Sequence, residues 1–132
     1  TRIWAVGDTG TASTIRKSVK VNGTWTSDPI FTVPSSLNPP GMIGYDDANN
    51  IVFAYKGTTI YALHGNSGAI LGTLTVTNGA NATPGYTGMY VDSVPGSGTA
   101  WFAGRGTTAT NVVFQKITYT VPTAAQDWSI YE

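Results

Sequence analysis

The chain has 132 residues, and its seven basic and seven acidic side chains give a formal net charge of zero. This balance excludes nucleic acid as a main partner, because phosphate binding requires a clustered excess of Lys and Arg. The chain contains no cysteine, which excludes disulfides, zinc–thiolate sites and thiol nucleophiles, and no apolar run approaches the roughly 20 residues of a membrane-spanning helix.

The first part of the chain already shows strand signals. Val, Ile, Thr and aromatic residues gather in short runs, the first of them at residues 2–6, and an Asn-Gly pair at 22–23 marks a hairpin turn. Between them, Arg16 and Lys20 would share one face of a strand, and Lys17 would take the other. We expect these cations to form a solvated strand edge that prevents edge-to-edge pairing.

The middle part of the chain predicts a complete four-stranded meander. Its strands are expected at residues 41–45, 51–55, 58–63 and 69–76. The connecting segments are short and rich in Gly, Asn and Asp, which are turn residues. Four short strands joined by tight turns are the unit of a β-propeller blade.

The last part of the chain begins the same pattern again. Gly88-Met89 matches Gly41-Met42, a turn is expected at residues 95–98, and a strand is expected at residues 100–103. Residues 127–132 form a final predicted strand. Helix signals are nearly missing throughout, because no stretch keeps a 3.6-residue apolar period for three turns. The fold class predicted is therefore all-β and antiparallel.

The three parts are copies of one repeat. Ala5, Ala54 and Ala103 occupy equivalent places at steps of 49 residues. A period in this range indicates repeated supersecondary units, so we predict one domain of three meander units of propeller type. The units cover approximately residues 1–40, 41–87 and 88–132.

The first unit lacks a counterpart of the first strand, because residues 2–6 match the second strand of the middle unit. Two completions remain open. Residues 127–132 either complete the first unit and close a ring, or finish the third unit, in which case Trp128 corresponds to Trp25. A sister subunit is a further source of the absent strand.

Residues 50–76, NIVFAYKGTTIYALHGNSGAILGTLTV, combine an apolar-aromatic strand, a Gly turn, an Ile-Tyr-Ala-Leu strand and a polar turn that ends in Gly. In these features the segment resembles the blade repeats of the quinoprotein-like and YVTN-like β-propeller families. The resemblance implies a propeller-type fold, which hosts many functions. Because known propellers have roughly four to eight blades, it also implies a dimeric six-bladed ring, a fragment of a larger ring, or a sandwich or prism of three sheets. The quinoprotein cofactor does not carry over, so no cofactor is expected.

Catalytic and metal-binding groups are few. The single histidine, His64, falls in a predicted turn, and most acidic residues also occupy turns. Asp46 and Asp92 follow equivalent first strands, so a propeller would direct them toward a common axis as a carboxylate pair. Residues 45–50 offer oxygen atoms of the kind that calcium favours, although a strand-connecting turn accounts for the same residues. We predict no catalytic residue and no metal site.

Of the functions considered, sugar binding is the one for which the chain has the most suitable side chains. Glycan sites stack an aromatic ring on the sugar and hold its hydroxyls with polar groups, and the chain has four Trp and seven Tyr. Trp4, Phe53 and Trp101 recur at equivalent places, which indicates packing between neighbouring sheets. The less regular aromatic residues and nearby polar residues are the predicted ligand-binding set. This set is Trp25, Tyr45, Asp46, Tyr86, Tyr90, Asp92, Arg105 and Trp128.

Charged residues form only 11% of the chain, against roughly a quarter in ordinary soluble domains, a composition typical of extracellular, cell-surface or virion β-proteins. The function predicted is therefore a non-enzymatic, lectin-like recognition module that binds a glycan and forms a homo-oligomer. A structural subunit of a filament, capsid decoration or phage tail is the alternative, because an incomplete sheet is completed by partners. A fragment of a larger propeller enzyme is a minor alternative.

Overall fold

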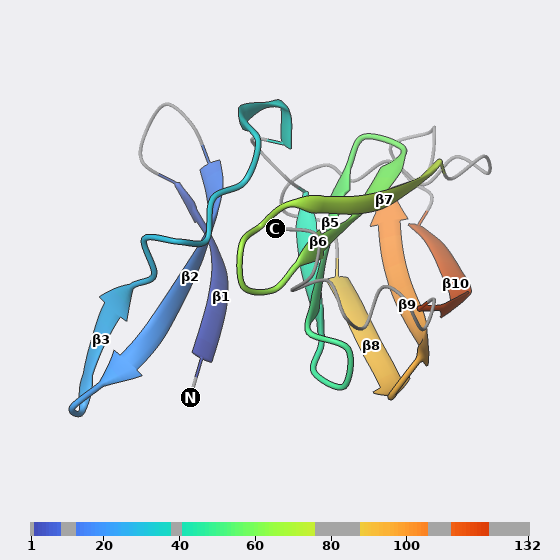
Figure 1. The fold of residues 1–132 in the computed structure, drawn as a ribbon. Helices are drawn as coiled ribbons and strands as arrows, with labels where there is room; N and C mark the ends of the chain where they lie inside the picture. Colours follow the sequence, from blue (N-terminus) through green and yellow to red (C-terminus); the bar gives the residue numbers. More distant parts are fainter. Residues whose placement is uncertain (1, 9–12, 38–40, 76–87, 106–111, 122–132) are drawn as a thin grey trace.

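The computed structural model describes residues 2–8, 13–37, 41–75, 88–105 and 112–121 (Figure 1). Within these ranges the chain forms ten strands and one short 3-10 turn, η1 (Ser35–Leu37). The strands make three sheets, in which all neighbouring strands are antiparallel. The prediction of an all-β, antiparallel fold is confirmed.

The first sheet has the strand order β1-β2-β3. It contains β1 (Arg2–Asp8), β2 (Ser13–Val21) and β3 (Thr24–Ser27). The hairpin between β2 and β3 turns at Asn22 and Gly23, whose φ angles of 48° and 84° suit the Asn-Gly pair. The hairpin predicted at residues 22–23 is therefore present.

The middle sheet is the predicted four-stranded meander, with the order β4-β5-β6-β7. Its strands are β4 (Met42–Asp46), β5 (Ile51–Lys56), β6 (Thr59–His64) and β7 (Ile70–Thr75). These bounds agree with the expected strands to within one or two residues, because local turn signals separate every pair of strands in this part of the chain.

The third sheet has the order β10-β9-β8. It contains β8 (Gly88–Val94), β9 (Ser97–Arg105) and β10 (Val112–Thr120). Strand β9 begins at Ser97, earlier than expected, because the turn uses only Pro95 and Gly96, and Gly96 has a φ of 87°. Each of the three sheets falls within one of the three predicted units.

The middle sheet lies between the other two (Figure 1). On one face of β5, Val52 and Ala54 belong to a buried cluster that includes Ile15 of the first sheet. On the other face, Phe53 and its alternate neighbours pack with Phe102 of the third sheet. Because both faces of β5 are covered, its sequence is a continuous apolar run instead of an alternating one.

Among the described residues, no other sheet covers the outer face of the first sheet or the outer face of the third sheet. In β8 and β10 the side chains alternate between exposed and half-buried, the pattern of a sheet packed on one side only. The described residues form no closed barrel or ring. The predicted strand at residues 127–132 lies outside the described residues.

The expectation that the basic cluster of β2 forms a solvated strand edge was wrong in two respects. Strand β2 is the central strand of its sheet, and Lys17 is only 5% exposed. Its Nζ lies 2.9 Å from Asp28 Oδ2 and 5.8 Å from the centre of the Trp4 ring. A carboxylate that follows the hairpin thus pairs with this cation and permits its burial, while Arg16 and Lys20 are exposed on the opposite face.

Candidate functional site

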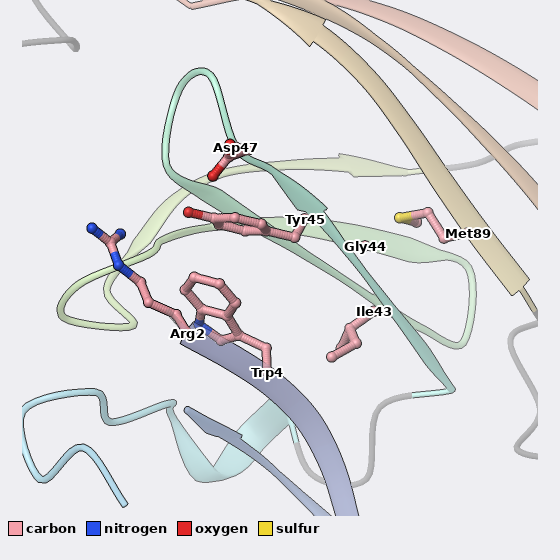
Figure 2. A pocket seen from close by; sticks show the side chains of 7 residues that line it. All are labelled: Arg2, Trp4, Ile43, Gly44, Tyr45, Asp47 and Met89. Carbon is pink, nitrogen blue, oxygen red and sulfur yellow. The ribbon is translucent and has the colours of Figure 1, made fainter. Parts of the chain in front are cut away.

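A pocket of about 720 Å³ lies beside β4 (Figure 2). Its lining comes from three strands and one turn. Strands β1, β4 and β8 are each the edge strand of their sheet, so the pocket marks the place where the three sheets approach one another. The lining residues are Arg2, Trp4, Ile43, Gly44, Tyr45, Asp47 and Met89.

Two stacked aromatic rings dominate the pocket. The ring centres of Trp4 and Tyr45 are 3.9 Å apart, and the ring planes differ by 29°. Trp4 points from β1 toward the middle sheet, and Tyr45 points from β4 toward the first sheet, as Figure 2 shows. The pair therefore fixes the distance between two sheets and at the same time supplies an aromatic wall.

Polar groups extend this wall. The Tyr45 hydroxyl donates a hydrogen bond to Asn50 Oδ1 over 3.1 Å, and Arg2 Nη1 donates to the same oxygen over 3.3 Å. Burial raises the pKa of Tyr45 above its ordinary value of 10, so the phenol stays protonated as a donor near neutral pH. In Figure 2 the Arg2 guanidinium, the Tyr45 hydroxyl and the Asp47 carboxylate point toward the same side of the pocket.

The opposite wall is apolar. Ile43, Gly44 and Met89 line it. A Cβ atom at Gly44 would lie 2.6 Å from Met89 Sδ, a separation that real Cβ atoms do not adopt, so the absence of a side chain at Gly44 leaves the space that the Met89 side chain occupies. The pocket therefore combines an apolar wall, an aromatic wall and two charged groups of opposite sign.

Trp4 also carries an unusual polar atom. Its Nε1 is buried, and it has no hydrogen-bond partner among the described residues. A buried donor of this kind can be satisfied by a water molecule or by an acceptor on a bound molecule.

Of the predicted ligand-binding residues whose side chains the structure describes, Tyr45 is the one in the pocket. Asp46, the next residue along β4, points to the opposite face and is fully buried. Its Oδ1 accepts a hydrogen bond from Asn49 N at 2.9 Å, and its Oδ2 accepts from Asn49 Nδ2 at 2.7 Å and from the Tyr119 hydroxyl at 2.6 Å. Asp46 therefore does not line this pocket, because its oxygens serve the interior of the fold.

The predicted carboxylate pair does not form either. Asp92 is exposed on β8, on the face opposite to Met89 and Val91, which pack toward the middle sheet. Asp46 is buried on the inner side. One buried and one exposed carboxylate do not flank a common cleft, as a glycosidase pair must.

The remaining predicted residues lie elsewhere. Tyr90 is exposed on the same face of the third sheet as Asp92, and Trp25 is exposed on β3. Arg105 ends β9, where its backbone pairs with Val112. Tyr86 and Trp128 lie outside the described residues. Neither Tyr90 nor Trp25 lines the pocket.

Sequence reasoning missed the other six pocket residues, namely Arg2, Trp4, Ile43, Gly44, Asp47 and Met89. The recurrence of Trp4 in the repeat predicts a packing role, whereas Trp4 both packs against the middle sheet and lines the pocket. The alternation of side chains along β4 could have indicated Asp47. Neighbouring residues of a strand point to opposite faces, so Asp46 cannot lie on the same side as Tyr45. Asp47, which follows the strand, is free to turn back toward Tyr45.

The geometry does not support a calcium site at residues 45–50 or a catalytic role for His64. Within the described residues no group of three or more His, Cys, Asp or Glu side chains is arranged to hold a metal ion. His64 Nδ1 lies 3.0 Å from Ser67 Oγ, which also accepts a hydrogen bond from Ala69 N at 3.3 Å. These contacts close the turn between β6 and β7.

Comparison with known proteins found no relative, since no family model, curated protein or solved structure matches the chain. The described part of the chain also contains no helix that is long and apolar enough to cross a membrane. Function must therefore be inferred from the chemistry of the pocket and from the packing of the sheets.

Proposed function

We propose that the chain is a non-enzymatic, lectin-like recognition module that binds a glycan in the pocket beside β4. The stacked Trp4–Tyr45 pair, with Arg2 and Asp47 on the same pocket, carries this proposal. A sugar ring has an apolar C–H face and a rim of hydroxyls, which match an aromatic wall bordered by one cation and one carboxylate. The volume of about 720 Å³ falls in the range of about 300–1,000 Å³ that small-molecule sites occupy.

Each polar group has a distinct task in this proposal. Arg2 presents several N–H donors, Asp47 accepts from hydroxyls, and Tyr45 offers a protonated phenol. Among the described residues that line the pocket, Asp47 is the single carboxylate. Hydrolysis of a glycosidic bond ordinarily needs two carboxyl groups, so the pocket favours binding over catalysis.

A propeller-type arrangement is the second part of the proposal. Three sheets packed in chain order, with the edge strands β4 and β8 next to each other, support it together with the repeat and the resemblance of residues 50–76 to propeller blades. Either residues 127–132 or a second copy of the chain would complete the ring. Low charge favours an extracellular, cell-surface or virion location.

Glycan binding to the purified chain tests the proposal. A broad glycan array would identify a ligand class, and isothermal titration would then compare Asp47→Asn with Asp92→Asn. Both substitutions remove an exposed carboxylate with little change of shape. We expect at least a tenfold loss of affinity for Asp47→Asn, the fold-change of about 1.4 kcal/mol, and no change for Asp92→Asn. The reverse result would move the site to the outer face of the third sheet, and an array without binding would refute the proposal.

The alternative function, a structural subunit of a filament, capsid decoration or tail assembly, is favoured by one observation. Large apolar side chains are exposed on the third sheet, including Tyr90 and Phe114, and such patches mark association surfaces. Large polymers of the native chain, formed without any glycan affinity, would favour this alternative.

A further inference from the structure

Strand β10 has a free edge (Figure 1). Among the described strands it pairs only with β9, over the nine residues from Val112 to Thr120. Ala103 of β9 is the repeat counterpart of Ala54 of β5, so β10 corresponds to β6, and the middle sheet has a fourth strand, β7, beside β6. A long edge strand presents a row of unpaired backbone N–H and C=O groups, which proteins ordinarily cover.

An apolar pocket of about 190 Å³ lies where a strand beside β10 would face the middle sheet. Strand β8 lies against β4, and Tyr119 of β10 lies against Phe53 of β5, so the next strand would lie over β6 and β7. Ala62 of β6 and Leu71 of β7 line the pocket, together with Tyr119. Because an apolar cavity of about 150 Å³ can hold a benzene ring, this pocket is large enough for one aromatic side chain.

Gln115 of β10 gives an independent sign that this edge is incomplete. Its Oε1 atom is buried and has no hydrogen-bond partner among the described residues. By the alternation of the strand, Gln115 shares the inner face of β10 with Ile117 and Tyr119. Buried polar atoms nearly always have a partner, and a strand beside β10 would bring N–H donors close to this oxygen.

The chain that follows β10 contains a suitable strand. The N–H of Val121 donates to the Gly96 carbonyl oxygen over 2.8 Å, and Val121 lines the pocket, so the chain leaves the third sheet beside it. Residues 127–132, DWSIYE, are predicted as a strand. Six residues, 121–126, separate this strand from β10, and five residues, 65–69, separate β6 from β7. The two connections are of similar length, which favours the same antiparallel hairpin.

We propose that residues 127–132 pair with β10 as the fourth strand of the third sheet, and that the Trp128 side chain fills the apolar pocket. A register that continues the hairpin places Trp128 opposite Tyr119 and Ile130 opposite Ile117. Directly opposed residues of antiparallel strands share a face, so both apolar side chains of the added strand face the middle sheet. The backbone groups along the edge of β10 gain partners at the same time.

This pairing decides between the two completions that the repeat leaves open. The other completion places residues 127–132 beside β1. Strand β1 is an edge strand, and its residues Arg2 and Trp4 line the pocket beside β4, so a strand added there would fill that pocket. Pairing with β10 leaves the pocket beside β4 open to a ligand.

Engineered disulfides in the whole chain test the pairing, because the natural chain contains no cysteine. Thr118 is exposed on β10, and in the proposed register it lies opposite Ser129. Opposed Cβ atoms lie about 4.5–5.5 Å apart, close to the separation of about 3.5–4.5 Å that a disulfide needs. Thr118→Cys is combined with Ser129→Cys, and with Asp127→Cys or Tyr131→Cys to test neighbouring registers. Arg2→Cys with Ser129→Cys tests pairing with β1.

We expect one of the three pairs with Thr118→Cys, first of all the pair with Ser129→Cys, to form an intramolecular disulfide in high yield. The Arg2→Cys pair should stay reduced. Equal yields from all three Thr118→Cys pairs would show an unpaired segment and overturn the proposal. A disulfide in the Arg2→Cys pair, disulfides only between chains, or none with Thr118→Cys would overturn it as well.

Urea unfolding followed by circular dichroism tests the place of the indole ring. Trp128→Ala removes the side chain that fills the pocket, and should lower the urea midpoint by about 1 M. Tyr131→Ala is the matched control, because Tyr131 lies on the opposite face of the same strand and its removal should shift the midpoint by less than about 0.3 M. Equal midpoints for the two variants would show that Trp128 does not occupy the pocket.

Discussion

Removal of the Tyr119 hydroxyl is the most direct test of how the middle and third sheets are joined. It donates a 2.6 Å hydrogen bond to Oδ2 of the buried Asp46, which links β10 of the third sheet to β4 of the middle sheet. Asn49 reinforces the same junction: its Nδ2 donates to the Val94 carbonyl oxygen at 3.1 Å, and its Oδ1 accepts from Gly96 N at 2.7 Å. Tyr119→Phe removes one hydroxyl and leaves the rest of this network in place.

The expected cost follows from the contacts. The ring of Tyr119 packs edge-on against Phe53, with ring centres 5.0 Å apart, and phenylalanine keeps that contact. The lost hydrogen bond has a carboxylate as acceptor, and bonds of this class contribute about 1.5–3 kcal/mol. Because Asp46 has no exposed surface, water cannot replace the hydroxyl, so we expect a loss of about 2–3 kcal/mol in the free energy of unfolding.

Urea unfolding followed by tryptophan fluorescence measures this loss. With a slope of about 1–3 kcal/mol per molar urea, the midpoint should fall by roughly 1 M or more. Tyr90→Phe is the matched control, because the Tyr90 ring is exposed and surface substitutions usually change stability by less than about 0.5 kcal/mol. Equal midpoints for Tyr119→Phe and Tyr90→Phe would refute the assigned role of the Asp46–Tyr119 bond.

Three further predictions concern titration and packing. Burial and the bond to Asp46 raise the pKa of Tyr119, so its contribution is complete below about pH 10 and is lost as pH rises further. Tyr119→Phe should therefore lose less stability in alkali than the unaltered chain, and parallel alkaline curves would contradict this. A hydrogen bond from Lys17 chiefly lowers the pKa of Asp28, so that pair stabilises the fold above about pH 4 and loses its effect as pH falls. Lys17→Met should flatten the acid dependence of urea midpoints, and an unchanged dependence would count against the pair. Gly44→Ala places a Cβ against Met89 and should lower stability by about 1–3 kcal/mol, whereas an unchanged midpoint would show that β8 moves away freely.

The sequence predicted the middle sheet well because its information is local. Each strand from β4 to β7 is bounded by turn residues, and the continuous apolar run of β5 fits a strand that is buried on both faces. The same local reading shows that Tyr45 and Asp46 point to opposite sides, once β4 is accepted as a strand.

The site itself depends on contacts that no local pattern contains. Whether Asp46 is buried is decided by Tyr119, which is 73 residues away in the sequence. The stacking of Trp4 on Tyr45 depends on how two sheets are placed against each other, and a repeat period does not specify that placement. The burial of Lys17 likewise depends on Asp28, which the β2–β3 hairpin brings to it.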